Sequence, residues 1–278
     1  MSLVRAALPS VPLVNRLPGV RKAPADGFTG LRRSRPPVTI EREHVERYAA
    51  VCGFPAKDTV PMTYPHLLAF GLHLEILGDQ AFPAPAIGTV HVENSITAYR
   101  PIAVGETLAV EVEVGAALPH PKGTAYAFEA TARSGDETVW ESTSTYLRRG
   151  ASTGSPAEGV DLPEAAPHGL TWRLPADLGR RYAAVSGDHN PIHLHPLTAR
   201  ALGFPRPIAH GMWSLARCVA AIENRLPGAV RVDAAFKKPI PLPGTVEYGV
   251  IRLDDGHAFS LSRPRDGAPH LLGRSTEM

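Results

Sequence analysis

Apolar residues recur at helical spacing in two segments of the chain, and each segment follows a proline-rich stretch. In the second segment these residues advance in steps of three and four, at Met212, Leu215, Val219, Ile222 and Leu226. The first segment shows the same spacing at Leu68, Leu72 and Ile76. This spacing predicts two helices. Because both are apolar around much of their surface, we expect them to be buried on several sides.

Strand-like alternation follows each predicted helix. Between residues 107 and 114, leucine and valine occupy the even positions, while the odd positions hold threonine, alanine and glutamate. This alternation predicts a half-buried strand. The stretches Thr138 to Arg148 and Thr245 to Leu253 continue the strand pattern. The simplest architecture is a sheet that wraps a central helix and occurs twice, which gives an α+β fold class.

Three short blocks recur in the same order, which indicates an internal duplication. The block Tyr48 to Gly53 recurs as Tyr182 to Gly187, at an offset of 134 residues and with Cys replaced by Ser. Arg100-Pro101-Ile102 recurs as Lys238-Pro239-Ile240, at an offset of 138. Between them, residues 61–63 align with residues 207–209 at an offset of 146, so the second copy contains a longer excursion at that point.

Two stretches without periodicity divide the chain. Residues 1–37 are rich in Pro, Arg and Gly, and we expect them to form a loosely ordered arm. The run from Gly150 to Pro167 concentrates Gly, Ser, Ala and Pro, which favours a linker at residues 151–167. The first repeat then occupies residues 38–150 and the second occupies residues 168–278, and each has the size of a small domain.

Charge and cysteine content exclude several classes of function. The formal net charge of +2 provides no strong field toward nucleic acid or an anionic membrane. No run approaches 18 uninterrupted apolar residues, so we predict no membrane span. Cys52 and Cys218 lie far apart in apolar surroundings, which predicts neither a disulfide framework nor a cysteine metal site and fits a cytoplasmic location. The N-terminal residues also lack the unbroken apolar region of a secretory signal.

Candidate chemistry is concentrated in the second repeat, in the stretch that contains Asp188, Asn190 and His193. Gly187 and the Asn-Pro pair rule out a regular helix here, so the acid and the imidazole can converge on a loop. Such a pair suits acid–base chemistry, and around one water it suits addition of water to a double bond conjugated to a thioester carbonyl. Gly211 begins the apolar helix, so its backbone N–H can stabilise negative charge on the thioester oxygen.

These residues resemble the hydratase 2 signature of the MaoC-like, double hot-dog dehydratases. The Gly-Asp-x-Asn-Pro-x-His element stands at residues 187–193, and the Ala-His-Gly-Met turn stands at residues 209–212. The strand at residues 236–240 and the tandem layout match as well. The resemblance implies a double hot-dog fold, with Asp188 and His193 as the catalytic pair. It also implies that Asn190 orients the catalytic water, and that Gly211 donates to the oxyanion.

The resemblance further implies an activity, which is reversible hydration of a trans-2-enoyl-CoA to a (3R)-3-hydroxyacyl-CoA without a metal or another cofactor. The first repeat lacks the required groups. Its equivalents of the acid, the amide and the imidazole are Phe54, Ala56 and Thr59, and Pro65 stands where the second repeat has Gly211. Proline has no N–H to offer an oxyanion. We therefore expect one active site per chain, and the resemblance assigns the acyl chain to the first repeat.

Two further groups of residues are candidates for binding the substrate. Phe54, Tyr64 and His66 could line the acyl tunnel, although residues at the start of an apolar helix often only pack. Arg206, Lys237 and Lys238 could contact the phosphates of coenzyme A, although surface cations are usually only solvated. His193 and His195 could bind a metal as an H-x-H pair, but no further ligand cluster is in register with them. We expect His189 and His195 to face solvent or to support the site from behind, and we expect a structural role for His210.

Other interpretations of the same residues remain open. The substrate could be carried by an acyl-carrier protein in fatty-acid or polyketide synthesis instead of by coenzyme A. A non-catalytic protein that binds acyl thioesters is a further alternative, which the intact motif disfavours. A thioesterase would need water to attack the carbonyl carbon and not the β-carbon. Because the two repeats already form an internal pair, both a monomer and a homodimer are compatible with the sequence.

Overall fold

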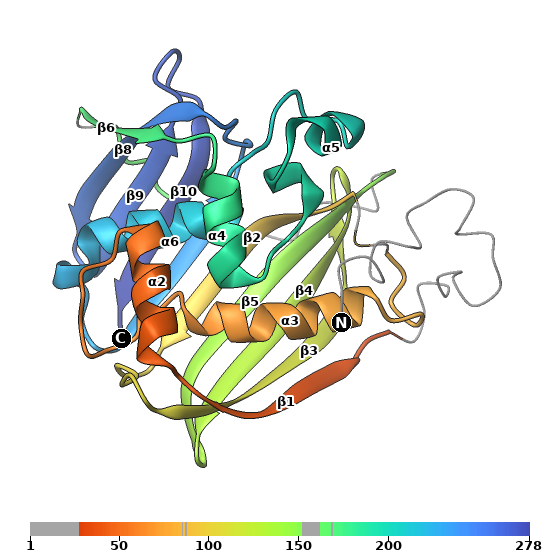
Figure 1. Cartoon of the computed structure of the whole chain (residues 1–278), viewed down its shortest axis with the longest axis vertical. Helices are drawn as coiled ribbons and strands as arrows, with labels where there is room; N and C mark the ends of the chain where they lie inside the picture. Colours follow the sequence, from red (N-terminus) through yellow and green to blue (C-terminus); the bar gives the residue numbers. More distant parts are fainter. Residues whose placement is uncertain (1–27, 85, 87, 152–161, 168) are drawn as a thin grey trace.

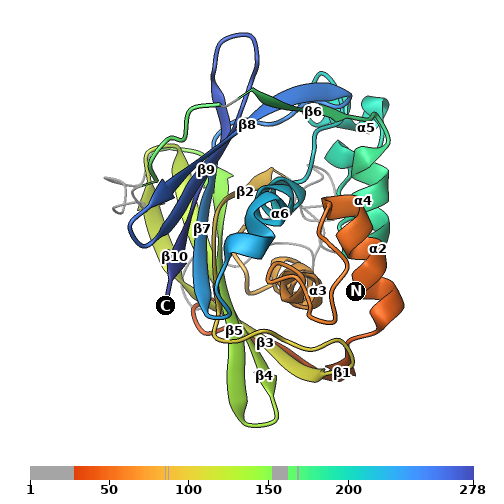
Figure 2. The ribbon, with the colours of Figure 1, turned by 90° about the vertical axis from the view of Figure 1, so that its left-hand side faces the viewer.

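The computed structural model describes residues 28–84, 86, 88–151, 162–167 and 169–278. Within them, one long antiparallel sheet curves around helices (Figures 1 and 2). The first repeat contains β1 (Arg32–Thr39), α2 (Arg42–Cys52), α3 (Pro65–Leu77), β2 (Thr89–Ala98), β3 (Thr107–His120), β4 (Gly123–Ser134) and β5 (Glu137–Arg149). The second contains β6 (Leu170–Leu174), α4 (Leu178–Ser186), η3 (Pro191–His193), α5 (Pro196–Ala201), α6 (Gly211–Ile222), η4 (Glu223–Arg225), β7 (Val230–Phe236), β8 (Gly244–Leu253), β9 (Gly256–Ser262) and β10 (Pro269–Glu277).

The strand order shows the duplication directly. Across the sheet the order is β1-β3-β4-β5-β2-β7-β10-β9-β8-β6. The first five strands, read from one edge, therefore have the same topology as the last five, read from the other edge. In each half an antiparallel sheet wraps one long helix, which confirms the predicted α+β double hot-dog fold. No helix in the described ranges is long and apolar enough to cross a membrane.

The two halves join along one pair of central strands, β2 and β7. These strands pair antiparallel from Glu93 opposite Ala235 to Ala98 opposite Val230. Backbone hydrogen bonds therefore continue from one repeat into the other without an edge. Pairing at this position also protects two strands that would otherwise offer unpaired N–H and C=O groups to other chains.

The two apolar helices lie inside the curve of the sheet, as their residue pattern predicts (Figure 2). In α3, ten of the thirteen residues are buried, and in α6 eight of the twelve are buried. The strand predicted at residues 107–114 alternates as expected, with Leu108, Val110, Val112 and Val114 at most 1% exposed. The second helix is shorter than predicted, because α6 ends at Ile222 and Leu226 follows a short 3₁₀ turn.

A second layer of helices packs the two repeats together. The recurring Tyr-Ala-Ala-Val block forms the C-terminal part of α2 and of α4, and the two helices lie against each other (Figure 1). The His44 side chain of α2 is hydrogen-bonded through Nε2 to the Val185 carbonyl oxygen of α4, at 2.9 Å. Trp213 of α6 donates from its indole N–H to the Val51 carbonyl oxygen, at 3.0 Å. These contacts hold the loop after α4 in a fixed position.

The prediction of a loosely ordered arm at residues 1–37 is wrong for residues 28–37, which pack on the fold or form part of β1. Residues 1–27 lie outside the described ranges. Phe28 is 2% exposed and packs edge-on against Phe82 and Tyr126. β1 then pairs with β3, with a register shift between Arg35 and Val38. The shift coincides with two consecutive prolines, which have no N–H to donate and are tolerated at the edge of a sheet.

The predicted linker at residues 151–167 is described only in part, because residues 152–161 lie outside the described ranges. Residues 162–167 form no helix or strand. Ala165 is fully buried, and its carbonyl oxygen accepts a hydrogen bond from the Ser260 hydroxyl of β9. A side chain at Gly249 of β8 would place its Cβ 2.4 Å from the same carbonyl oxygen. Glycine at this position therefore allows residues 162–167 to lie directly on the strand.

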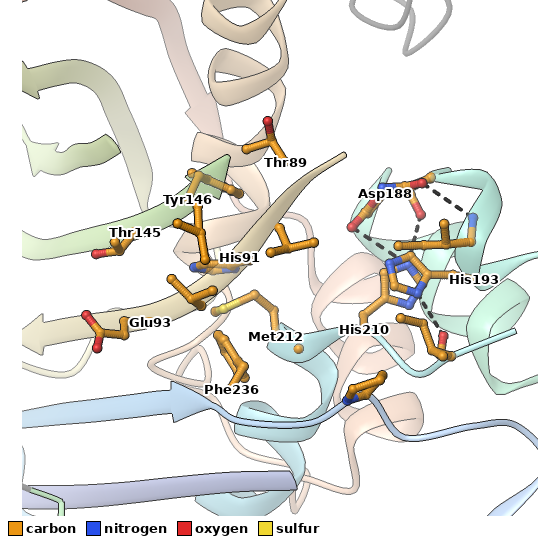
Figure 3. Close-up of a pocket in the computed structure, with 18 of the residues that line it drawn as sticks. Thr89, His91, Glu93, Thr145, Tyr146, Asp188, His193, His210, Met212 and Phe236 are labelled. Atoms are coloured by element: carbon orange, nitrogen blue, oxygen red, sulfur yellow. Dashed lines mark hydrogen bonds and ion pairs between the residues drawn. The ribbon is translucent and has the colours of Figure 1, made fainter. Parts of the chain in front are cut away.

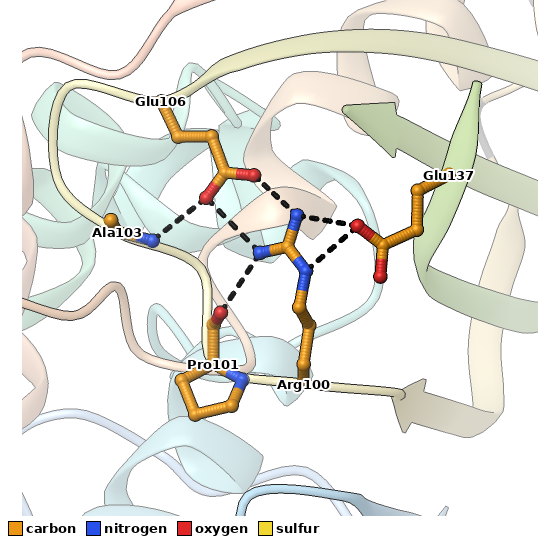
Figure 4. Close-up of polar contacts among 5 residues, drawn as sticks. All are labelled: Arg100, Pro101, Ala103, Glu106 and Glu137. Atoms are coloured by element: carbon orange, nitrogen blue, oxygen red, sulfur yellow. Dashed lines mark hydrogen bonds and ion pairs between the residues drawn. The ribbon is translucent and has the colours of Figure 1, made fainter. Parts of the chain in front are cut away.

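The duplicated block at residues 100–102 and 238–240 has a different role in each repeat. In the first repeat the Arg100 guanidinium donates to Glu106 and Glu137 and to the Pro101 carbonyl oxygen, and the Ala103 N–H also donates to Glu106 (Figure 4). The Arg100 hydrogen bonds hold the pKa of Glu106 at about 2. In the second repeat Lys238 occupies the equivalent position and lines a cavity. The same block therefore braces a turn in one repeat and contributes to a cavity in the other.

Candidate active site

The loop after α4 places the predicted acid at the surface of a cavity. Gly187 ends the helix in the left-handed region, with φ of 74°, and its N–H bonds to the Ala183 carbonyl oxygen. Glycine adopts this conformation without steric cost. The chain therefore leaves the helix at once. Asp188 Oδ1 then accepts the Asn190 N–H at 3.1 Å, which closes a tight turn.

The turn continues into the short helix that carries the predicted imidazole. The Asn190 side-chain oxygen accepts the Ile192 N–H at 3.4 Å and caps η3. His193 is only 8% exposed, and its Nδ1 lies 2.7 Å from the Ile208 carbonyl oxygen. Since a carbonyl oxygen can only accept, Nδ1 carries the proton. The lone pair of His193 is therefore on Nε2.

Asp188 and His193 perturb one another inside this pocket. Burial raises the pKa of Asp188, and the nearby His193 opposes that rise. Burial lowers the pKa of His193, and Asp188 opposes that fall. The Asp188 side chain is 21% exposed. A carboxyl group and an imidazole whose pKa values are shifted toward one another are suited to exchange protons with a bound water.

His210 lies against both members of this pair. Its ring stacks on the His193 ring, with centroids 3.6 Å apart and planes at 27°. Its Nε2–H donates to the Asp188 backbone carbonyl oxygen at 3.0 Å, and the same nitrogen lies 3.8 Å from Asp188 Oδ2 (Figure 3). Burial, and then the neighbouring His193, hold the pKa of His210 well below its usual value. His210 is thus a neutral ring that fixes the backbone of the acid and the plane of the base.

The sequence interpretation gave His210 only an unspecified structural role. Its position directly before Gly211, in the Ala-His-Gly-Met turn, was the available signal. By contrast, His189 and His195 are exposed, as expected, and His195 caps α5 by accepting the Leu197 N–H. The H-x-H pair therefore does not converge, because His193 is buried and His195 faces outward.

Gly211 is the first residue of α6 and lines the same cavity. Amide groups in the first turn of a helix have no acceptor within the helix and lie at the positive end of its dipole. A Cβ at Gly211 would lie 3.2 Å from the Phe236 ring. A side chain here would therefore press on Phe236 or project into the cavity, and glycine leaves the N–H accessible to a substrate oxygen.

The cavity measures about 1430 Å³ and is lined by both repeats. This exceeds the usual 300 to 1,000 Å³ of small-molecule pockets, so it can hold a long ligand. The second repeat contributes Asp188, Asn190, His193, His210 and Gly211. The first contributes one face of α3 and the beginning of β2, with His66, Phe70, Leu74, Leu77 and His91.

The predicted substrate-binding residues divide into two groups. His66, Lys237 and Lys238 line the cavity, and both lysines are exposed. Phe54 and Tyr64 are not among the described lining residues, so their prediction as contacts in the acyl tunnel is wrong, whereas the contact of Arg206 with the phosphates of coenzyme A stays a prediction. Phe54 instead stacks on Tyr48 at 6.1 Å, Tyr64 is hydrogen-bonded to His44 at 2.6 Å, and Arg206 is exposed elsewhere. The loop before α3 is shorter than its counterpart, which turns these aromatic rings into the core.

Metal binding is the alternative role for Asp188, His193 and His210. Asp188, His193 and His210 each have a ligand atom within 4.8 Å of the others. A ligated metal lies in the plane of each imidazole at about 2.0 to 2.1 Å. The two rings are stacked and nearly parallel, so one ion cannot lie in both planes. This geometry favours proton transfer over metal binding.

Comparison with known proteins agrees with this geometry. A family model described as MaoC like domain matches residues 162–259. The chain is 36% identical over 273 residues to 3-hydroxyacyl-thioester dehydratase X of Mycobacterium tuberculosis, covering 97% of this chain and 95% of that protein. A crystal structure of HtdX from Mycobacterium tuberculosis has 34% identity and a TM-score of 0.80, covering 89% of this chain and 100% of that chain. A MaoC-like dehydratase from Phytophthora capsici, with 20% identity and a TM-score of 0.75 over 92% and 98% of the two chains, shares the fold.

The family match includes the loop with Asp188 and His193 and the start of α6. The full-length similarity extends it to the first repeat, which supplies the rest of the cavity. The chain therefore belongs to the MaoC-like dehydratase family and is a hydro-lyase of that type.

Proposed function

We propose that the chain catalyses the reversible syn addition of water to a trans-2-enoyl-CoA, giving a (3R)-3-hydroxyacyl-CoA. The observation that carries the proposal is the placement of Asp188, of His193 with its unprotonated Nε2, and of the Gly211 N–H in the wall of one long cavity. The names of two relatives agree with it, an enoyl-CoA hydratase 2 of Arabidopsis thaliana and an (R)-specific enoyl-CoA hydratase of Aeromonas caviae.

Proton transfer follows from these positions. In the hydration direction, a water between Asp188 and His193 gives up one proton to the pair, at the unprotonated Nε2 of His193, as its oxygen bonds to C3. The electrons of the double bond move toward the thioester oxygen, where the Gly211 N–H stabilises the negative charge. Collapse of this enolate then takes that proton from the pair to C2, so Asp188 and His193 end in the protonation states in which they began. Because Asp188 and His193 lie close together in one part of the cavity wall, both would meet the substrate from one side, and the hydroxyl and the proton would add to the same face.

The thioester carrier is coenzyme A in this proposal. Lys237 and Lys238 are exposed at the end of β7 and line the cavity, where they can meet phosphate groups. A carrier protein presents a similar pantetheine arm, and it is the second candidate. Replacing both lysines with glutamate should raise KM for an enoyl-CoA far more than KM for the matching enoyl-pantetheine, which lacks the nucleotide phosphates. Equal effects on both would favour the carrier-protein alternative.

The test of the reaction is a hydration assay over a series of 2-enoyl-CoA chain lengths, following the loss of conjugated absorbance. Asp188→Asn and His193→Ala should each lower kcat by roughly 10² to 10⁴. The double variant should be little worse than either single variant, because both groups act on one water. His195→Ala is the matched control and should retain activity. Full turnover by a folded Asp188→Asn protein would contradict the assignment.

A further inference from the structure

Four polar rings cluster beside the part of the cavity that the first repeat supplies, and three of them line it, whereas His73 is fully buried behind the wall. His66 and His73 come from α3, His91 comes from β2, and Tyr146 comes from β5. We call these residues the histidine cluster. Their rings form a closed set of contacts, with centroids 5.5 Å apart for His66 and His73, 5.7 Å for His73 and Tyr146, 4.7 Å for Tyr146 and His91, and 6.1 Å for His91 and His66.

The cluster lies between the reaction centre and the apolar end of the cavity. Figure 3 shows His91 and Tyr146 on the opposite side of the view from Asp188, His193 and His210. Along α3, the cavity wall continues from His66 through Phe70 and Leu74 to Leu77. At 1.5 Å per residue, this face extends for roughly 16 Å. An acyl chain that starts at Asp188 and His193 would therefore pass the histidine cluster before it reaches Leu74 and Leu77.

The hydrogen bonding of the cluster is incomplete. His73 Nδ1 and the Tyr146 hydroxyl are hydrogen-bonded at 3.0 Å. His66 Nδ1, His73 Nε2 and His91 Nε2 are all buried without a hydrogen-bond partner. An unsatisfied buried polar atom usually costs about 1 to 3 kcal/mol, so buried polar groups nearly always have partners. Two of these atoms belong to His66 and His91, which line the cavity, so their partner can come from a molecule bound there, whereas His73 is buried behind them.

The charge state of the cluster limits what that partner can be. Burial lowers the pKa of His66 to about 4, and burial together with His66 lowers the pKa of His91 to about 3. The pKa of His73 is also held well below its usual value by burial, and then by His66 and His91. The rings are therefore neutral near pH 7. Each neutral imidazole has one donor and one acceptor, which matches a hydroxyl but provides no counter-charge for a carboxylate.

Resting on the proposed function, we infer that the histidine cluster selects acyl chains that carry a neutral hydroxyl group beyond the reacting carbons, in preference to plain alkyl chains. The hydroxyl hydrogen-bonds to His66 and His91, which line the cavity, and the rest of the chain lies against Leu74 and Leu77. In a tunnel that serves only alkyl chains, the same positions would be apolar, because each buried methylene is worth about 0.8 kcal/mol against an apolar wall.

The test compares trans-2-dodecenoyl-CoA with derivatives that carry one hydroxyl at carbon 5, 6, 7, 8 or 9. The measured quantity is the ratio of kcat/KM for the hydroxylated substrate to kcat/KM for the plain one. We expect this ratio to exceed one at one or two adjacent positions. It should fall by about tenfold or more in His66→Leu and in His91→Leu, and His91→Gln should recover part of it. A ratio below one at every position would overturn the inference.

A matched control separates this role from a packing role. His257 also has a buried ring nitrogen without a partner, and it is 3% exposed, but it lies on β9 outside the described cavity lining. His257→Leu should leave the substrate ratio unchanged. The Tm of His66→Leu and of His91→Leu should equal or exceed that of the wild type, because each substitution removes an unsatisfied polar group. A large fall in Tm with an unchanged ratio would show that the cluster only stabilises the fold.

A binding measurement keeps the inference distinct from the proposed reaction. Saturated dodecanoyl-CoA and its hydroxylated derivatives have no double bond to hydrate, so their Kd values report on the cavity alone. The same preference for the hydroxyl, and the same loss in the leucine variants, should appear by calorimetry. If no enoyl-CoA is hydrated but this preference persists, the proposed reaction is wrong and the inference about the histidine cluster is supported. If hydration proceeds without any preference in Kd, only the inference about the cluster fails.

Discussion

His210 shows how a single ring can organise a catalytic pair without a place in the reaction itself. It stacks on His193 and donates to the backbone oxygen of Asp188, and it directly precedes Gly211. Its pKa is held far below neutrality by burial, so it adds no positive charge next to His193. We expect it to act by positioning, since its Nε2–H donates to a backbone oxygen and not toward the substrate.

Two substitutions separate the contributions of the His210 ring and of its N–H. His210→Phe keeps the stacking and removes the donor, and His210→Gln keeps an amide donor and removes the ring. One hydrogen bond is worth about 0.5 to 1.5 kcal/mol, so His210→Phe should lower kcat by up to about tenfold and leave KM nearly unchanged. His210→Gln should recover activity relative to Phe. An unchanged kcat in a folded His210→Phe protein would show that this hydrogen bond does not position the acid.

At the scale of one element, α3 sets the length of the acyl site. Leu74 lies two turns beyond His66 on the face of α3 that lines the cavity, whereas Leu72 is buried on another face. Leu74→Trp should block the apolar end. Rates with long-chain enoyl thioesters should fall by about fourfold for each methylene that loses its contact, at about 0.8 kcal/mol each, while short chains react normally. Leu72→Met is the control, and equal losses at all chain lengths for Leu74→Trp would contradict this assignment.

The turn between β2 and β3 makes a separate prediction about pH. Arg100 holds the pKa of Glu106 at about 2, below the ordinary value of 4.5. A carboxyl group with a depressed pKa in the folded state stabilises the protein above the unfolded pKa, and this stabilisation is lost as pH falls from about 4.5 toward 2. Glu106→Gln should therefore lower the free energy of unfolding by about 1 to 2 kcal/mol at pH 7, after allowance for solvent screening.

Urea denaturation at pH 7 and at successively lower pH values measures this difference. The gap between wild type and Glu106→Gln should narrow below about pH 4.5, as Glu106 gains its proton in the unfolded chain first. Glu137 is the comparison, because its side chain is 58% exposed and its ion pair should contribute less. A gap that does not change with pH would show that packing, and not charge, stabilises the turn.

At the scale of the whole molecule, the repeats should unfold together. The β2–β7 pairing, the packing of α2 on α4 and the Trp213 hydrogen bond all cross between them. Separate unfolding would expose two central strands and the buried faces of both inner helices. We expect a single urea transition, with the same midpoint by far-UV circular dichroism and by tryptophan fluorescence, which reports on Trp140 in the first repeat and on Trp172 and Trp213 in the second. Two transitions, or midpoints that differ between the probes, would indicate that each repeat is stable alone.

The parts of this molecule that could be predicted from the sequence are those with a local or periodic signal. The duplication, the two buried helices and the loop with Asp188 and His193 each occupy one contiguous segment. β1 was missed because Pro36 and Pro37 interrupt its pattern, and only its position at the sheet edge makes them acceptable. The histidine cluster could not be predicted, because α3, β2 and β5 bring its members together across the fold.

The same limit explains the error at Phe54. Its position was transferred from Asp188 by a constant offset, which assumes that both loops follow one path. The first loop is shorter, and Phe54 packs on Tyr48 instead of reaching the cavity. Equivalence in alignment therefore did not mean equivalence in space where an insertion separates the copies.

The uninterrupted ladder between β2 and β7 has a consequence for how such a protein can change. Two identical subunits that pair along the same strands must accept every mutation twice, once on each side of the symmetry axis. With both halves encoded in one chain, a substitution on α3 alters one wall of the cavity and leaves α6 untouched. Selectivity for the acyl chain and the chemistry at the thioester can therefore evolve independently, while the hydrogen-bonded strands β2 and β7 keep the two halves in register.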